Sequence, residues 1–298
     1  MEVYIWNTVI ILSKIVFYIG FACTSGYTFF SQRFESSESH NNLIIVDLKW
    51  IKVLIVAALL ANTIWFIAST GAMAEEGIQG AFALDMLDIM WNSSIGDGAL
   101  LRGFGLVLAI VSLALPFNFK SVVLNKYLKQ SVLVSSLLTL AYSFTLLGHV
   151  SELGILEKGL LTLHVLVMAW WFGALLPLKL ACQQLNYAEL QLLMVSFGNQ
   201  ASFAVSLLLV AGLWLVIQLV GSVDALISSS YGHTLLFKLA LVVSILAIAA
   251  KHKLRLVPQL KNSQGREALS KSILIEMVVA LGILSITSGF TTVVGPAY

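Results

Sequence analysis

The chain has 298 residues, of which 59% are hydrophobic and only 11% charged, and its formal net charge is +2. A soluble domain usually carries about 25% charged residues, so the composition excludes an ordinary soluble protein and predicts a helical membrane protein. The small net charge and the lack of a basic patch with interleaved aromatic residues exclude a nucleic-acid-binding protein. The two cysteines have no C-x-x-C spacing and give no disulfide framework.

Stretches of about 20 apolar residues predict an all-α fold, a polytopic transmembrane bundle of about eight helices. These stretches cover residues 5–30, 50–73, 98–117, 130–149, 159–179, 197–220, 233–251 and 272–294. The start of the chain, MEVYIW, has no basic region and no clear cleavage site, so we expect a retained first helix. We expect a single integral membrane domain over 1–298, with N-terminal helices in 1–130 and C-terminal helices in 131–298.

The positions of lysine and arginine predict the orientation of the bundle. All but four of the 17 basic residues fall in or beside the loops that follow the first, third, fifth and seventh segments. Cytoplasmic loops of membrane proteins carry the excess of basic residues. We therefore expect both termini outside the cytoplasm. The four exceptions are Lys14, Arg102, Lys158 and Lys238.

Between the second and third segments, residues 82–91 (FALDMLDIMW) predict a short interfacial helix on the outer face. Met86 and Met90 are four residues apart and share one side of it, and Met73 ends the preceding segment. Thioethers suit Cu(I), so these three methionines are candidates for capture of copper at the outer face. An apolar helix that lies in the membrane interface explains these methionines equally well.

The stretch 161–180, LTLHVLVMAWWFGALLPLKL, carries one histidine in the middle of an apolar run. His164 and Met168 are four residues apart, so they lie on the same helix face one turn apart. An ionisable group inside a membrane segment is costly and marks a possible functional site. A histidine hydrogen-bonded to a neighbouring helix is the alternative.

Three of the five histidines share one depth in the predicted topology. His149 ends the fourth segment at the outer face, His164 lies about a turn below that face, and His233 opens the seventh segment there. Neutral imidazole is the commonest metal ligand, and a thioether such as that of Met168 tilts the choice toward copper, as Cu(I) rather than Cu(II). We therefore predict a copper site formed by these four residues. Three unrelated polar residues near a wet interface are the alternative.

Two charged residues in the last two segments are candidates for a pathway or gating role. Lys238 lies about one and a half turns deeper than His233. Glu276 lies near the cytoplasmic start of the last segment, where we expect it to meet Lys253 or Arg255. We expect His252 to be solvated in the loop before that segment.

Four stretches resemble the copper resistance protein D (CopD) family, most clearly over residues 145–298. They are GHVSE at 148–152, LHVLVMAWWFGALLPL at 163–178, YGHTLLFKLALVVSILAIAAKHKLRLVPQL at 231–260 and SITSGFTTVVGP at 285–296. The family's G-H and L-H histidines correspond to His149 and His164. The chain departs from the family at Lys251-His252-Lys253, where many members have Asn-Arg, and at Gly173-Ala174, where they have Gly-Gly.

The resemblance implies a multi-pass protein of the bacterial inner membrane that takes part in copper homeostasis and copper resistance. It implies transport of copper from periplasm to cytoplasm, with a periplasmic copper-binding CopC-like protein as a partner. No enzymatic activity is expected. A second interpretation stays open, a haem b-binding, quinone-linked electron-transfer protein, because His149 or His233 together with His164 could be the axial ligands of a haem.

Overall fold

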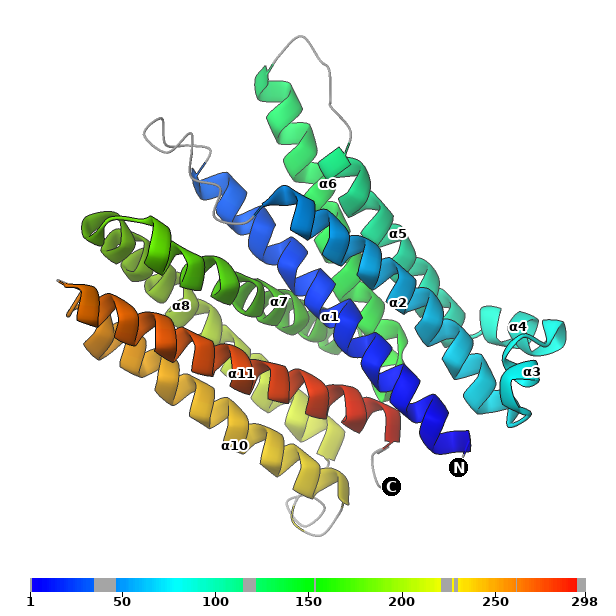
Figure 1. Ribbon diagram of the computed structural model, residues 1–298. Coiled ribbons are helices and arrows are strands. Elements are labelled where there is room, and N and C mark those ends of the chain that lie inside the picture. Colours follow the sequence, from blue (N-terminus) through cyan, green and yellow to red (C-terminus); the bar gives the residue numbers. More distant parts are fainter. Residues whose placement is uncertain are drawn as a thin grey trace. The chain divides into compact units, whose positions relative to one another are not determined.

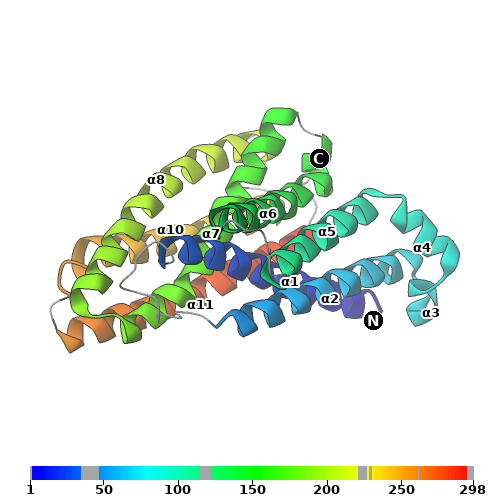
Figure 2. The ribbon, with the colours of Figure 1, turned by 90° about the horizontal axis from the view of Figure 1, so that it is seen from above.

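The computed structural model describes residues 2–34, 47–114, 122–152, 154–220, 227, 230–260 and 262–293, and every element in these ranges is helical. This confirms the predicted all-α fold (Figures 1 and 2). The chain divides into two compact units. Unit 1 comprises Met1–Thr28 and Leu48–Trp170, and unit 2 comprises Phe29–Asp47 and Trp171–Tyr298.

Unit 1 is built around four long helices, which pack through small residues. They are α1 (Glu2–Phe34), α2 (Leu48–Ala74), α5 (Ser94–Ala114) and α6 (Val122–Tyr142). A Cβ added at Gly20 of α1 would lie 2.5 Å from the Cβ of Ala58 on α2, so the two helices are in close contact there. Between α5 and α6, Ser136 donates a hydrogen bond to the carbonyl of Gly105 at 2.6 Å.

The segment that joins α2 to α5 folds into two short helices, α3 (Gly77–Ala81) and α4 (Leu84–Trp91), at one end of unit 1 (Figure 1). The predicted short helix over 82–91 is therefore confirmed as α4. Its apolar residues Leu84, Ile89 and Trp91 are exposed, Leu84 to 82%, whereas Met90 is buried. The segment is tied to the start of the chain, because Gly77 donates its backbone N–H to Glu2.

Unit 1 also contains two 3₁₀ helices, η2 (Ser143–Leu146) and η3 (Gly148–Glu152). The first half of α7 (Ile155–Gln184) follows them, and the second half of α7 belongs to unit 2. α6 ends at Tyr142, so the predicted fourth segment, 130–149, extends too far. The 3₁₀ helix η2 interrupts it, and the G-H motif itself lies on η3.

Unit 2 continues with α8 (Tyr187–Val220), α10 (Ser230–Lys251), the π-helical turn η4 (His252–Leu256) and α11 (Ser263–Val293). α10 packs against α11. Arg266 at the start of α11 donates to the carbonyl of Leu185 at 2.9 Å, and its guanidinium lies 4.2 Å from the ring centroid of Tyr187. This arginine therefore satisfies a carbonyl at the end of α7, where the helix leaves it without an internal donor.

Within the described residues, seven helices are long and apolar enough to cross a membrane. They cover Glu2–Phe30, Leu48–Ala74, Ser94–Ala114, Ile155–Gln184, Tyr187–Trp214, Leu235–Leu256 and Ser263–Gly289. Each corresponds to a predicted segment. α8 and α11, which correspond to the sixth and eighth predicted segments, start about ten residues earlier than expected because their first turns contain polar residues. α6 is not among the seven, since Asn125, Lys126 and Lys129 lie in its first half.

Candidate functional site

A polar cluster in unit 2 joins the end of α10 to α11. His252 is the first residue of η4, and its Nδ1 lies 3.1 Å from Oε2 of Glu276. Its Nε2 lies 2.7 Å from Oγ of Ser272. Ser272 and Glu276 are four residues apart on α11, so one imidazole bridges two side chains on the same helix face.

The carboxylate in this cluster has little access to water. Glu276 is 2% exposed, and it is the one acidic residue among the buried polar residues that the structure describes. A buried carboxylate is costly unless it is paired and hydrogen-bonded. An ionised carboxylate can only accept hydrogen bonds. A neutral His252 beside it therefore carries its proton on Nδ1, and its Nε2 accepts a hydrogen bond from the serine hydroxyl.

Two predictions about this region are wrong. His252 is partly buried and hydrogen-bonded rather than solvated, and it takes the place expected for Lys253 or Arg255 beside Glu276. The side chain of Lys253 instead contacts α8, where its Nζ donates to Oγ of Ser202 at 2.7 Å. Successive side chains on a helix point about 100° apart, so once His252 faces α11 its neighbour faces a different helix.

His164 and Met168 lie on one continuous helix, α7, as the sequence predicts. Both side chains are partly buried, and Nδ1 of His164 is shielded from solvent. The four-residue spacing places imidazole and thioether on the same face one turn apart. These two residues therefore have the relative position that the copper hypothesis requires.

His149 lies on η3, directly after a glycine in a left-handed conformation. Gly148 has a φ of 67°, and a Cβ added there would meet nothing within 4 Å. The backbone conformation, rather than a lack of space, therefore favours glycine at this position of the G-H motif. The side chain of His149 lies outside the described residues.

His233 lies in the first turns of α10, is exposed, and bonds through Nε2 to the carbonyl of Ile227. Lys238 is on the same helix, and its side chain lies outside the described residues. His233 belongs to unit 2, whereas His149 and His164 belong to unit 1. The convergence of the three histidines stays a prediction.

No group of three or more histidine, cysteine, aspartate or glutamate side chains that could hold a metal occurs in the described part of the chain. Methionine is not among these four residue types, so this finding does not cover Met168. A site made of His149, His164, His233 and Met168 thus remains a hypothesis based on the sequence.

The three outer methionines differ in their exposure. Met73 is 67% exposed and Met90 only 4%. Met86 has intermediate burial. Met90 is packed inside unit 1, so of the three methionines Met73 is the most accessible to a copper ion at the surface.

Arg102 lies in the interior of unit 1 and is 2% exposed. Its guanidinium carbon is 4.4 Å from the ring centroid of Trp65, 4.7 Å from that of Phe17 and 5.2 Å from that of Phe144. The electron-rich faces of aromatic rings attract a desolvated cation. Three different elements thus stabilise a charge that the membrane would otherwise disfavour.

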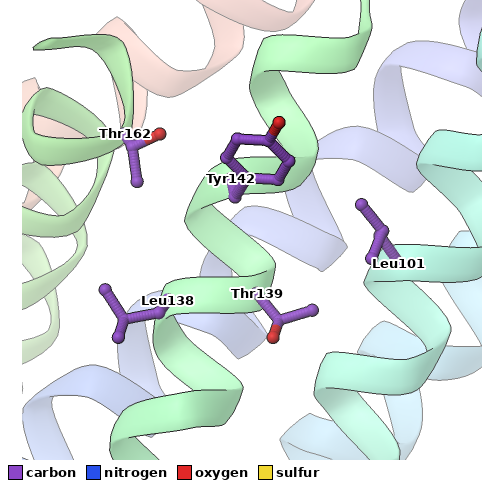
Figure 3. Close-up of a pocket in the computed structure, with 5 residues that line it drawn as sticks. All are labelled: Leu101, Leu138, Thr139, Tyr142 and Thr162. Atoms are coloured by element: carbon purple, nitrogen blue, oxygen red, sulfur yellow. The ribbon is translucent and has the colours of Figure 1, made fainter. Parts of the chain in front are cut away.

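Figure 3 shows a hollow between α5, α6 and α7, lined by Leu101, Leu138, Thr139, Tyr142 and Thr162. Both threonine hydroxyls donate to carbonyls of their own helices, Ser135 and Lys158. The hollow is therefore apolar in character and offers no ligand set for a metal.

Two family models match the chain and together cover most of it. The model described as copper resistance protein D-like, N-terminal domain, matches residues 5–156, and the model described as copper resistance protein D matches residues 191–290. The chain belongs to the copper resistance protein D family. No curated protein and no solved structure matches it.

Membership of the copper resistance protein D family and seven apolar helices identify a copper-resistance-related, multi-pass membrane protein. The N-terminal match extends the likeness to the first half of the chain, outside the range 145–298 where the four quoted stretches resemble the family most clearly. The matched ranges include His149, His233, His252 and Glu276, whereas His164 lies between them.

Sequence reasoning missed His252 as the partner of Glu276 and the aromatic environment of Arg102. The departure from the family pattern at residues 251–253 was a usable sign, because it introduces a histidine near a buried carboxylate. No comparable sign existed for Arg102, since Phe17, Trp65 and Phe144 are far apart in the sequence.

Proposed function

We propose that this copper resistance protein D family member is a transporter, not an enzyme, and moves copper ions across the bacterial inner membrane from periplasm to cytoplasm. Family membership is the observation that carries the proposal, because it relates the chain to copper resistance over residues 5–156 and 191–290. The seven apolar helices support it, since a transporter needs a membrane-spanning scaffold.

The proposed entry site consists of His149, His164 and His233, with Met168 one turn deeper as the next ligand. Imidazole and thioether are suitable donors for Cu(I). The shared face of His164 and Met168 on α7 supports an inward step from the first ligand to the second. A periplasmic copper-binding CopC-like protein would deliver the ion to this site.

The proposed inner end of the path contains Glu276, and Lys238 is assigned to the region near the outer mouth as a packing anchor or electrostatic gate. A buried carboxylate favours a passing cation. The burial of Glu276 and its hydrogen-bonded partner His252 support this role. A fixed cation such as Lys238 would disfavour copper, which suits a gate rather than a ligand.

Copper binding to the purified protein tests the entry site. We expect wild-type protein to bind Cu(I), and His164→Ala and His149→Ala to weaken binding by about 100-fold or more, because even outer-shell partners of metal ligands contribute about 10- to 100-fold. Arg255→Ala, at an exposed position, serves as the control. Wild-type affinity in both histidine variants would exclude the site.

An absorption spectrum of the same preparation distinguishes the haem b interpretation. Bound copper without a Soret band is expected for the transporter. A Soret band that is lost in His164→Ala would favour an electron-transfer protein, because two histidines on different helices would then ligate the haem iron.

A further inference from the structure

We propose that His252 and Glu276 form a proton-binding site, and that the proton bound there is exchanged for one copper ion during transport. This inference rests on the proposed copper transport and adds its coupling ion. The observation that carries it is the contact of Nδ1 of His252 with Oε2 of Glu276 at 3.1 Å, where Glu276 as a residue is only 2% exposed.

The position of the pair gives the proton a route to water. The side chain of His252 is 14% exposed, whereas that of Glu276 is 3% exposed. His252 therefore lies between solvent and the buried carboxylate. In the predicted topology this solvent is the cytoplasm, because Lys251, Lys253 and Arg255 surround His252 in the sequence.

The hydrogen bonds of the cluster accommodate both protonation states of the imidazole. With a neutral His252, Ser272 donates its hydroxyl proton to Nε2, which lies 2.7 Å away. When His252 gains a second proton at Nε2, the serine hydroxyl rotates and accepts instead. A proton can thus be added at Nε2 and passed from Nδ1 to Glu276 without separation of the three side chains.

No other acid contacts His252 in the described residues. η4 packs against α8, α10 and α11. On η4 itself Lys253 and Arg255 are exposed, and Lys253 is directed to Ser202 on α8. On α11 Arg266 donates to the carbonyl of Leu185, and Glu267 and Lys271 pair with each other at 2.6 Å on the surface. Lys251, the last residue of α10, is exposed. The protonation of the cluster is therefore governed by His252 and Glu276.

Charge balance makes the proton and copper competitors. One buried carboxylate compensates one positive charge, and a second uncompensated charge in a low-dielectric interior is strongly unfavourable. A proton taken up from the cytoplasm through His252 therefore neutralises Glu276 until one Cu(I), arriving from the outer side, displaces that proton outward. The exchange involves no oxidation or reduction.

The test uses purified full-length protein in lipid vesicles with a pH-sensitive dye inside. Cu(I), kept reduced by ascorbate, is added outside, and internal copper and internal pH are recorded with and without an acidic interior. We expect an acidic interior to accelerate copper uptake by wild-type protein, and copper uptake to raise the internal pH.

The substitution Glu276→Gln keeps the shape of the side chain and removes its charge. We expect it to reduce the response to the pH gradient by about tenfold or more, because the amide has no carboxylate that could take up the exchanged proton. The matched control is Glu267→Gln, an exposed glutamate on the same helix, which is expected to behave like the wild type. His252→Gln should resemble Glu276→Gln.

The outcomes separate this inference from the transport proposal. Absence of copper uptake by the wild type would contradict transport itself. Copper uptake by the wild type without proton movement would overturn the exchange and leave transport intact, and so would a full gradient response in Glu276→Gln. Should that variant fail to fold, Ser272→Ala replaces it. The site would be overturned if Ser272→Ala keeps the full gradient response and the infrared spectrum of the wild type shows no carboxyl band on acidification.

Discussion

His252 and Glu276 are 3.1 Å apart although they belong to different helical elements, the π-helical turn after α10 and the helix α11. The contact places a basic ring against the carboxylate of a residue that is 2% exposed. π-helical turns occur frequently at functional sites. The relationship gives Glu276 a partner within the membrane bundle and makes the stability of unit 2 depend on the pair.

Removal of His252 should therefore destabilise the protein more than neutralisation of Glu276. We expect His252→Ala to lower the free energy of unfolding by about 3 kcal/mol, because it leaves a buried carboxylate unpaired. Glu276→Gln in the His252→Ala background should recover part of this loss. Thermal unfolding in detergent measures both, with Lys271→Ala as a surface control that leaves stability unchanged. A smaller loss for His252→Ala than for Lys271→Ala would contradict the pairing.

Arg102 should not be replaceable by lysine. The guanidinium lies within 5.2 Å of three ring centroids, those of Phe17, Trp65 and Phe144. A planar guanidinium stacks on aromatic faces better than an ammonium group does. We expect Arg102→Lys to cost about 2 kcal/mol of stability, the value of a desolvated cation–π interaction, whereas Arg255→Lys at an exposed position should be neutral. Equal melting temperatures for the two variants would refute this role.

Gly148 and Gly159 should respond to alanine with opposite signs. Gly148 has a φ of 67°, so alanine there should cost about 1–2 kcal/mol from the left-handed conformation. Gly159 lies inside α7 with open space around its Cβ position. Alanine at Gly159 should stabilise the helix by roughly 0.5–1 kcal/mol. Unfolding of the two variants measures the difference, and the same sign for both would contradict the backbone argument.

The orientation of the bundle is open to chemical labelling. We expect Ser263→Cys, introduced after replacement of Cys23 and Cys182 by alanine, to resist a membrane-impermeant thiol reagent in intact cells and to react after the cells are opened. The expectation follows from the concentration of basic residues in this region of the chain. Labelling of intact cells would place the loop before α11 outside and the predicted copper site on the cytoplasmic face.

The sequence predicts the helices well and their side-chain partners poorly. Apolar length and period give α1, α2, α5, α7 and α11, and the short helix α4, because these depend on local composition. The starts of α6, α8 and α11 are not predictable in this way, since polar residues continue a helix beyond its apolar part. The end of α6 is missed because a 3₁₀ helix replaces it after Tyr142. The spacing of His164 and Met168 is local and holds on α7.

The contacts of Glu276 and Arg102 depend on tertiary packing. His252 and Lys253 are adjacent in sequence and equally plausible as partners of a carboxylate. On η4 their side chains point in different directions, His252 toward Glu276 on α11 and Lys253 toward Ser202 on α8. Arg102 is surrounded by rings from different elements, which periodicity within one helix does not reveal. The predicted meeting of three histidines also depends on tertiary packing and stays a hypothesis.

Uptake of Cu(I) into vesicles that contain the purified protein tests copper transport most directly. We predict time-dependent accumulation of copper in vesicles with the wild type. The initial rate of accumulation should fall by about tenfold or more in His164→Ala, because removal of one ligand weakens the entry site. The Arg255→Ala variant should accumulate copper like the wild type. Copper accumulation by wild-type vesicles no faster than by protein-free vesicles would contradict the account.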